Sequence, residues 1–400
     1  MDAYIYDAVR TPRGSIRKNG SLKNIKPALL FKILTSALDN RNNQIIPHAQ
    51  DVILGCVTQI KDQGANIAKT ATMYAQLPES LPAMTVNRLC TSGLDAVSIA
   101  ASKVHSGFED VILAGGLESV SNVPMFSDEG AWFTDSEISK TTKFVHMGIS
   151  ADLVASLENL SRAELDEFAA RSHQLSAYAE QQNRFQHTLV PIIEKGTLLL
   201  DHDENIRAHT SIETLQQLEP CFEPFLTATQ REIIQQQFPM MESIAHLHHV
   251  GNSPSLADGA GLIVVGNKLA EQKLQTKPIA KIVGTTSIAT HPMLLLGGQT
   301  AAESLLKKCH LSIEQIDVIE FYEAYAATAV KAKKDWHAKE AQFNPNGGVI
   351  ATGHALGATG AIMLCSLLEE LEYKNGRYGL IAMCGGGGVG TAMIIERLVR

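Results

Sequence analysis

Two cysteines and one histidine stand in loops where their side chains could do chemistry. Cys90 lies in VNRLCTSGL, residues 86–94, His354 lies in GHALGATG, residues 353–360, and Cys384 precedes a run of four glycines. The thiolate is the nucleophilic form of cysteine, and histidine is the usual base near neutral pH. One cysteine could attack a carbonyl carbon, the second could move a proton, and the histidine could serve both. This combination indicates carbon–carbon chemistry on thioesters.

The sequence places Cys90 just before a predicted helix, on a turn that Ser92 and Gly93 favour. The first turn of a helix offers free N–H groups and the positive end of its dipole, so we expect a lowered pKa for this thiol. The alternative is a buried structural cysteine, which is common. His354 also precedes a predicted helix, and its flanking glycines let an imidazole protrude. The alternative there is a histidine that caps the helix.

The glycine run at residues 385–390 could be mistaken for a dinucleotide-binding loop. It stands too near the end of the chain for the βαβ unit and the acidic residue that such a site needs. We therefore interpret these glycines as backbone N–H donors that face an oxyanion next to Cys384.

The histidines at positions 246, 248 and 249 raise the question of a metal site. No acidic residue or cysteine stands nearby at the spacing of metal ligands, so the sequence favours a solvated loop. The remaining cysteines form no pair at metal spacing either; these are Cys56, Cys221, Cys309 and Cys365. We predict no metal centre.

The elements that must position these loops repeat along the chain. In the first half, a strand over residues 51–57 precedes the Cys90 loop, and a helix over 94–104 and a strand over 110–114 follow it. In the second half the same order runs through 317–322, the His354 loop, 361–371 and 378–383. Cys90 follows Asp51 by 39 residues and His354 follows Asp317 by 37. This repetition predicts two similar α/β halves, although chance repetition is common in α/β proteins.

The composition changes between residues 117 and 250. Ser161 and Glu164 form a capping-box pattern before a long amphipathic helix that we expect to reach about residue 185. Strand-like sequence returns at 259–265. We predict a first half of residues 1–116 plus 251–270, an insertion of helix and loop at 117–250, and a second half of 271–400.

The bulk properties limit the possible partners. The 400 residues are 45% hydrophobic and 19% charged, with a formal net charge of −8 and no long run of like charge. These values are typical of a water-soluble globular protein and argue against nucleic acid or a membrane as the main partner. The first residues read as a strand and a turn without the pattern of a signal peptide, and the six cysteines have no regular spacing. We therefore expect a cytoplasmic protein with reduced thiols.

At these residues the sequence resembles the thiolase family of coenzyme A-dependent acyltransferases, over nearly the whole chain. The matching motifs are VRTP at 9–12, NRLCTSG at 87–93, GGLESVS at 115–121, HMG at 146–148, the segment from NGG at 346–348 to Gly360, and CGGGGVG at 384–390. The resemblance implies a thiolase-like α/β fold with layers stacked α-β-α-β-α and a mostly helical insertion. It also implies a homodimer or homotetramer, with acyl-CoA and CoA as substrates and no permanently bound cofactor.

The resemblance further implies a role for each reactive residue. Cys90 would carry the acyl group as a thioester, His354 would take the thiol proton, and Cys384 would shuttle a proton to or from the α-carbon of acetyl-CoA. The N–H groups of Cys90 and Gly386 would form one oxyanion hole, and His354 with a bound water would form the other. The residues implied in contacts with CoA are His146, Met147, Ser253, Ser255, Ala324 and Tyr325.

Two positions depart from the family pattern. The usual Asn-Glu-Ala-Phe motif reads YEAY at residues 322–325, so that Tyr322 replaces the asparagine that holds the water. A phenol can donate one hydrogen bond but is bulkier than an amide, so Tyr322 either replaces the water or reshapes the pocket. Pro254 stands where the family has a serine that contacts pantetheine, and Ser253 or Ser255 could substitute.

These observations favour a thiolase that cleaves 3-ketoacyl-CoA with CoA, or runs the condensation in reverse. One alternative is another condensing enzyme of the same fold, similar to the ketoacyl synthases, but those lack a second cysteine like Cys384. Another is a non-catalytic acyl-CoA-binding relative, which only Tyr322 supports.

Overall fold

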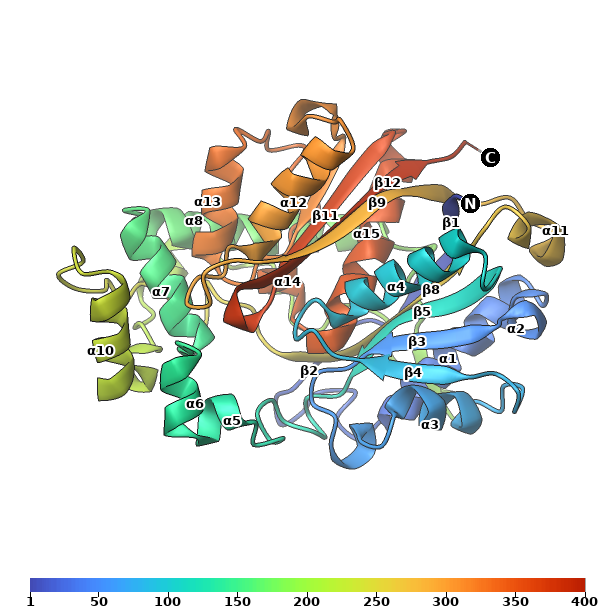
Figure 1. The fold of residues 1–400 in the computed structure, drawn as a ribbon, viewed down its shortest axis with the longest axis horizontal. Helices are drawn as coiled ribbons and strands as arrows, with labels where there is room; N and C mark the ends of the chain where they lie inside the picture. The colour runs from blue at the N-terminus through green and yellow to red at the C-terminus, as the bar shows by residue number, and fades with distance from the viewer. Residues whose placement is uncertain (400) are drawn as a thin grey trace.

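The computed structural model describes residues 1–399 and has five layers in the order helix, sheet, helix, sheet, helix (Figure 1). Strands of the first half run in the order β1-β8-β5-β3-β4, and those of the second half run β10-β11-β12-β9. The strands are β1 (Ala3–Arg10), β3 (Asp51–Gly55), β4 (Ala83–Val86), β5 (Val111–Glu118), β8 (Ala257–Gly266), β9 (Ala280–Ala289), β10 (Val318–Phe321), β11 (Tyr378–Cys384) and β12 (Val389–Arg397), with the short β2 (Gly14–Ser15) paired to β8. The predicted α/β class and layering are confirmed.

The middle layer consists of two helices, α4 (Ser92–Ser106) and α15 (Thr359–Lys374), which follow the Cys90 and His354 loops. Their side chains form one core with the inner faces of both half-sheets, including Ile53, Leu94 and Ile381. The two helices approach closely because Gly360 has no side chain: a Cβ there would lie 2.6 Å from the backbone nitrogen of Leu94. This close approach brings the starts of both helices, and the loops before them, to the same place.

The outer layers cover the far face of each half-sheet. Helices α1 (Pro27–Arg41) and α3 (Ile67–Tyr74) pack on the first half, in a core that includes Phe31, Ile67 and Leu262. Helices α12 (Gly297–Lys308) and α13 (Ala326–Asp335) pack on the second half, around Leu305, Ala327 and Phe343. Both half-sheets are therefore buried on two faces, which explains why their central strands read as nearly continuous apolar runs.

The two half-sheets meet along one seam. Strand β1 pairs antiparallel with β9, with Tyr4 opposite Lys281 and Ile5 opposite Ala280. The repeat in the sequence predicts the two halves but not the pairing of β1 with β9. No sequence feature in either half identifies the edge strand that pairs with the other half. The seam fixes the halves relative to each other at the ends of the strands.

The labelled helices of the insertion lie to one side of the layers, at the left in Figure 1, whereas its hairpin packs on the first half, where Ile192 and Leu200 join the core beneath α1. Its elements are α5 (Ala131–Thr134), α6 (Ser136–Thr141), α7 (Met147–Leu157), α8 (Arg162–Gln181), α9 (Ile212–Gln216), α10 (Ala228–Gln237) and the hairpin β6 (Ile192–Glu194) with β7 (Thr197–Leu200). The capping box of Ser161 and Glu164 starts α8 as predicted. The proposed domain boundaries remain a prediction.

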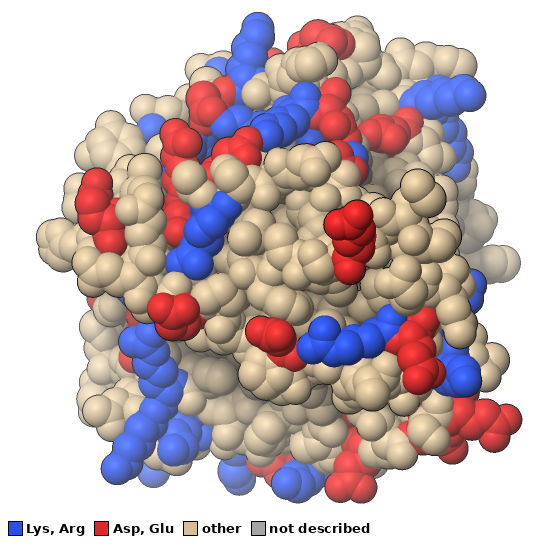
Figure 2. All heavy atoms as spheres, turned by 90° about the vertical axis from the view of Figure 1, so that its left-hand side faces the viewer, with Lys and Arg blue, Asp and Glu red and all other residues tan. Residues whose placement is uncertain are grey.

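The surface formed by this side of the molecule carries both signs of charge around a largely uncharged central area (Figure 2). No single-sign field covers it, in agreement with the scattered charge of the sequence.

Within residues 1–399, no helix combines the length and the apolar character needed to cross a bilayer.

Candidate active site

The Cys90 loop joins β4 to α4 and is fixed by its own side chains. The Ser92 hydroxyl accepts a hydrogen bond from the Arg88 N–H at 2.8 Å and donates to the Leu89 carbonyl at 2.6 Å. Leu89 has φ +53°, a left-handed conformation that turns the chain sharply before Cys90. Cys90, a half-buried residue, is consequently held at the start of α4.

The protonation of Cys90 differs from the expectation based on its helix. Burial raises the pKa of the Cys90 thiol to about 11, against hydrogen bonds from the Tyr322 hydroxyl and from the N–H groups of Cys90 and Gly386, which lower it. The predicted lowered pKa is therefore wrong, because the cost of removing a thiolate from water exceeds these stabilising contacts. The thiol needs a base at the moment it attacks.

His354 lies next to Tyr322 on the loop before α15 and is 4% exposed, so it does not protrude into solvent. Its Nδ1 pairs with the Thr359 hydroxyl at 2.8 Å, whereas its buried Nε2 has no hydrogen-bond partner among the described residues. Burial, with the nearby Arg13 charge, lowers the pKa of His354 to about 3. The imidazole is therefore neutral, and its Nε2 can accept a proton if the Thr359 contact keeps the hydrogen on Nδ1.

Cys384 ends β11 and is buried next to Cys90. Burial and the neighbouring Cys90 sulfur raise the pKa of the Cys384 thiol. The glycines that follow bring backbone to the first cysteine: a Cβ on Gly385 would lie 3.5 Å from the Cys90 nitrogen, and the Gly386 N–H bonds to the Cys90 sulfur. The interpretation of this run as a set of backbone donors to an oxyanion remains a prediction.

Tyr322 stands at the centre of these three groups. It follows β10, is 3% exposed, and its ring centroid lies 5.0 Å from that of His354. Its hydroxyl faces the Cys90 sulfur, and burial, together with the two cysteines, raises the pKa of the phenol well above its usual value. Tyr322 is therefore a neutral hydrogen-bond donor under all physiological conditions.

The residues expected to contact CoA lie around this centre at different depths. Met147 and Tyr325 pack at the margin of the core that contains Tyr322, Ala324 and Cys384. His146 lies farther out, with its ring stacked on Phe225 at 4.4 Å between centroids, and burial lowers its pKa to about 4.

The segment around Pro254 runs directly along the histidine loop. The Ser255 carbonyl accepts the N–H of His354 at 2.7 Å, so that this residue holds the loop through its backbone. The Ser253 hydroxyl is buried and has no hydrogen-bond partner within residues 1–399. Of the two serines, Ser253 thus offers the polar group that still lacks a partner.

Glu118 is a functional residue that sequence reasoning missed, although it stands in the motif GGLESVS. It is fully buried at the end of β5 and accepts the N–H groups of Val57 at 2.8 Å, Thr58 at 3.0 Å and Gly357 at 3.0 Å. Gln63 adds a fourth donor at 2.9 Å. A carboxylate directly after a fully apolar strand was the signal that could have identified it.

The interpretation of the three histidines as a solvated loop is wrong. His248 and His249 are fully buried and bind carboxylates: His248 Nδ1 lies 2.7 Å from Asp152, and His249 Nε2 lies 2.8 Å from Asp166. His246 also pairs with Asp152, at 2.9 Å. No group of three or more histidine, cysteine or acidic side chains arranged to hold a metal occurs in residues 1–399.

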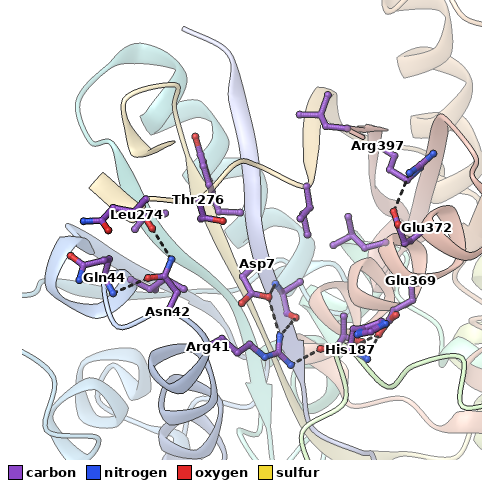
Figure 3. Close-up of a pocket in the computed structure, with 18 of the residues that line it drawn as sticks. Asp7, Arg41, Asn42, Gln44, His187, Leu274, Thr276, Glu369, Glu372 and Arg397 are labelled. Atoms are coloured by element: carbon purple, nitrogen blue, oxygen red, sulfur yellow. Dashed lines mark hydrogen bonds and ion pairs between the residues drawn. The ribbon is translucent and has the colours of Figure 1, made fainter. Parts of the chain in front are cut away.

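A cavity of about 800 Å³ lies far from this chemistry, at the opposite end of α15 (Figure 3). The 16 residues of α15 place the two ends about 24 Å apart. Arg41 and Arg397 line the cavity, but each is paired with a carboxylate, Asp7 and Glu372 respectively. These pairs leave neither arginine free for an anionic ligand, so we place the active site at Cys90.

Comparison with known proteins identifies the family. Residues 3–231 match the thiolase N-terminal domain and residues 276–397 match the thiolase C-terminal domain. The chain is 36% identical to a 3-ketoacyl-CoA thiolase of Marinobacter nauticus, with 99% of this chain and 98% of the relative covered. It is 34% identical to a beta-ketoadipyl-CoA thiolase of Pseudomonas knackmussii, with 99% of each covered. The crystal structure of the Bacillus anthracis acetyl-CoA acetyltransferase superimposes with a TM-score of 0.84 at 28% identity, covering 99% of each chain. The chain belongs to the thiolase family.

Proposed function

We propose that the protein cleaves 3-ketoacyl-CoA with free CoA, and catalyses the reverse condensation, through an acyl thioester on Cys90. The observation that supports this most strongly is the convergence of Cys90, His354, Cys384 and Tyr322 from separate loops on one buried site. The relatives' names, 3-ketoacyl-CoA thiolase and beta-ketoadipyl-CoA thiolase, are compatible with this chemistry.

In the first half-reaction, His354 Nε2 takes the proton of the Cys90 thiol, and the sulfur attacks the 3-keto carbon. When the tetrahedral intermediate collapses, the bond between C2 and C3 breaks and its electron pair stays on C2. The Cys384 thiol protonates C2, and acetyl-CoA leaves. The site then holds an acyl-Cys90, an imidazolium and a Cys384 thiolate, so that the two buried charges offset each other.

In the second half-reaction, the Cys384 thiolate takes the thiol proton of incoming CoA, and the CoA sulfur attacks the acyl group. The Cys90 thiolate leaves and recovers its proton from His354. Every group returns to its starting state, which is why neither thiol needs a low pKa in the empty enzyme.

Two sets of donors stabilise the developing negative charges. The N–H groups of Cys90 and Gly386, which both lie near the Cys90 sulfur, are placed for the oxygen of the tetrahedral intermediate. Tyr322 and the free Nε2 of His354 are placed for the enolate oxygen. Because the phenol reaches Cys90 directly, Tyr322 serves as the donor in place of a water.

The decisive experiment follows the loss of acetoacetyl-CoA, seen as its magnesium enolate, after addition of CoA. We expect CoA-dependent loss with the wild type and none above background with Cys90→Ala. If neither acetoacetyl-CoA nor longer 3-ketoacyl-CoAs are cleaved by the wild type, the proposal is wrong and the acyl-CoA-binding alternative gains support.

The division of labour between the cysteines has its own test. We expect Cys384→Ala to accept an acyl group on Cys90, detected by intact-protein mass spectrometry, but to lose exchange of the α-protons of acetyl-CoA with deuterated water. Normal exchange in this variant would reject the role of Cys384. A ketoacyl synthase-like enzyme does not depend on this cysteine, so the same variant separates the two functions.

We further propose that CoA acts here as a substrate rather than a resident cofactor, in a homodimer or homotetramer located in the cytoplasm. The free state of all six cysteines supports a reducing compartment. Light scattering coupled to gel filtration will give the oligomeric state.

A further inference from the structure

We propose that Trp132 is a specificity-determining residue that closes the acyl side of the Cys90 site and restricts it to short, uncharged acyl groups. This inference rests on the proposed function, because it concerns the acyl group that Cys90 carries. It names a property that neither Cys90, His354, Cys384 nor Tyr322 determines.

The observation is a contact between the insertion and the glycine run. A Cβ built on Gly387 would lie 2.6 Å from Cη2 of Trp132 and within 3.4 Å of two further atoms of its six-membered ring. The indole therefore rests on the bare backbone of Gly387, whose φ of +70° also favours glycine. Gly386, the next residue, carries the N–H that bonds to Cys90.

No buried side chain anchors α5, the helix that carries Trp132. Trp132 itself is only half-buried. Its ring stacks on Phe144 with centroids 5.5 Å apart and planes at 25°, and Phe144 packs edge-on against Phe133. These aromatic contacts hold the indole in place before any substrate binds.

The neighbouring walls are apolar as well. On Gly386, a built Cβ would meet Leu89 at 3.5 Å and the Met147 sulfur at 3.8 Å. An acyl chain on Cys90, with its oxygen at the Gly386 N–H, must leave between these side chains and the indole. We expect these side chains to leave little room for a long acyl chain, and a terminal carboxylate there would lose its water without gaining a cation. Lys143, next to Phe144, already donates to Gln237 at 2.9 Å.

The test compares thiolysis of acetoacetyl-CoA, 3-oxododecanoyl-CoA and 3-oxoadipyl-CoA. With the wild type we expect kcat/KM for the four-carbon substrate to exceed that for the other two by on the order of 100-fold. Trp132→Ala should raise the ratio of the twelve-carbon to the four-carbon substrate at least tenfold, and Trp132→Phe should fall between. Phe108→Ala removes an aromatic side chain that is 80% exposed and makes none of these contacts, so it should leave this ratio unchanged and serves as the control.

A binding measurement keeps the inference independent of turnover. In a Cys90→Ala background, which cannot be acylated, titration calorimetry should show that Trp132→Ala tightens binding of dodecanoyl-CoA at least tenfold while butanoyl-CoA is unaffected. Unchanged ratios in both the kinetic and the binding series would overturn the role of Trp132. Preferred cleavage of 3-oxoadipyl-CoA would overturn the restriction to uncharged groups. If no 3-ketoacyl-CoA is cleaved at all, the proposed function fails, while the calorimetric series still decides on Trp132.

Discussion

At the scale of single residues, Tyr322 is the position where this site differs most from the family pattern. An asparagine holds a water at a distance, whereas the phenol itself reaches the Cys90 sulfur and lies against His354. We propose that this one side chain stabilises the nucleophile before attack and donates to the enolate after bond cleavage. The arrangement avoids ordering a water but fixes a bulky ring beside the reacting carbon.

Removing only the hydroxyl tests this double role. We expect Tyr322→Phe to lower kcat by about 10²–10³-fold with little change in KM, because a preorganised donor acts mainly in the transition state. The variant should also raise the pKa of Cys90, since the hydrogen bond that favours the thiolate is lost. Slower alkylation by iodoacetamide at a given pH will reveal that shift.

Tyr322→Asn provides the matched comparison, because it restores the family's residue and its space for a water. Partial recovery of kcat relative to Tyr322→Phe is expected. Full activity of Tyr322→Phe, with an unchanged alkylation profile, contradicts the assignment of the phenol as a donor.

At the scale of elements, Glu118 connects the two catalytic loops. Its carboxylate binds Val57 and Thr58 at the end of β3 and Gly357 on the His354 loop, three residues from the base. The first half of the molecule therefore positions the histidine loop of the second half through one buried carboxylate. We classify Glu118 as a positioning residue, since no contact to the reacting sulfur is made through its side chain.

Glu118→Gln keeps the shape but replaces one oxygen by an amino group that faces N–H donors. Because each buried donor left unpaired costs about 1–3 kcal/mol, we expect the free energy of unfolding to fall by about 2–5 kcal/mol in urea titrations. We also expect kcat to fall more than KM rises, as the distance between Cys90 and His354 changes. As a control, Cys56→Ala removes only the thiol contact to Glu118 at 3.7 Å and should cost less. Equal stability of Glu118→Gln and the wild type contradicts the role.

At the scale of the whole molecule, local and long-range features differ in how far the sequence reveals them. The loops around Cys90, His354 and Cys384 could be predicted because glycines and apolar strands mark them within about ten residues. The burial of His248 and His249 could not, because their partners Asp152 and Asp166 lie 96 and 83 residues away. The raised pKa of Cys90 could not be predicted either, because it results from the packing of both halves around the thiol. The pairing of β1 with β9 likewise arises only when the two halves assemble.

A buried charge cluster joins the insertion to the first strand and lies close enough for one of its charges to act on His354. Asp203 is 5% exposed and pairs with Arg10 and Arg13, each at 3.0 Å, and the Arg13 charge contributes to the low pKa of His354. Removing one partner of a buried ion pair leaves a charge uncompensated, which typically costs about 3–5 kcal/mol.

We therefore expect Asp203→Asn to lower the free energy of unfolding at pH 7 by about 3–5 kcal/mol. The control Asp201→Asn, at an exposed position, should change this free energy little. Although burial opposes it, the two arginines hold the pKa of Asp203 below its usual value of 3.8. A carboxyl whose pKa is lower in the folded state stabilises the fold above the unfolded pKa and loses this contribution as it protonates. The difference between wild type and Asp203→Asn should thus be constant from pH 7 to about 4 and shrink as the pH falls below 3.8. Urea titrations across this range will measure it, and a difference that grows toward acid pH would contradict the ion pair as the source of stability.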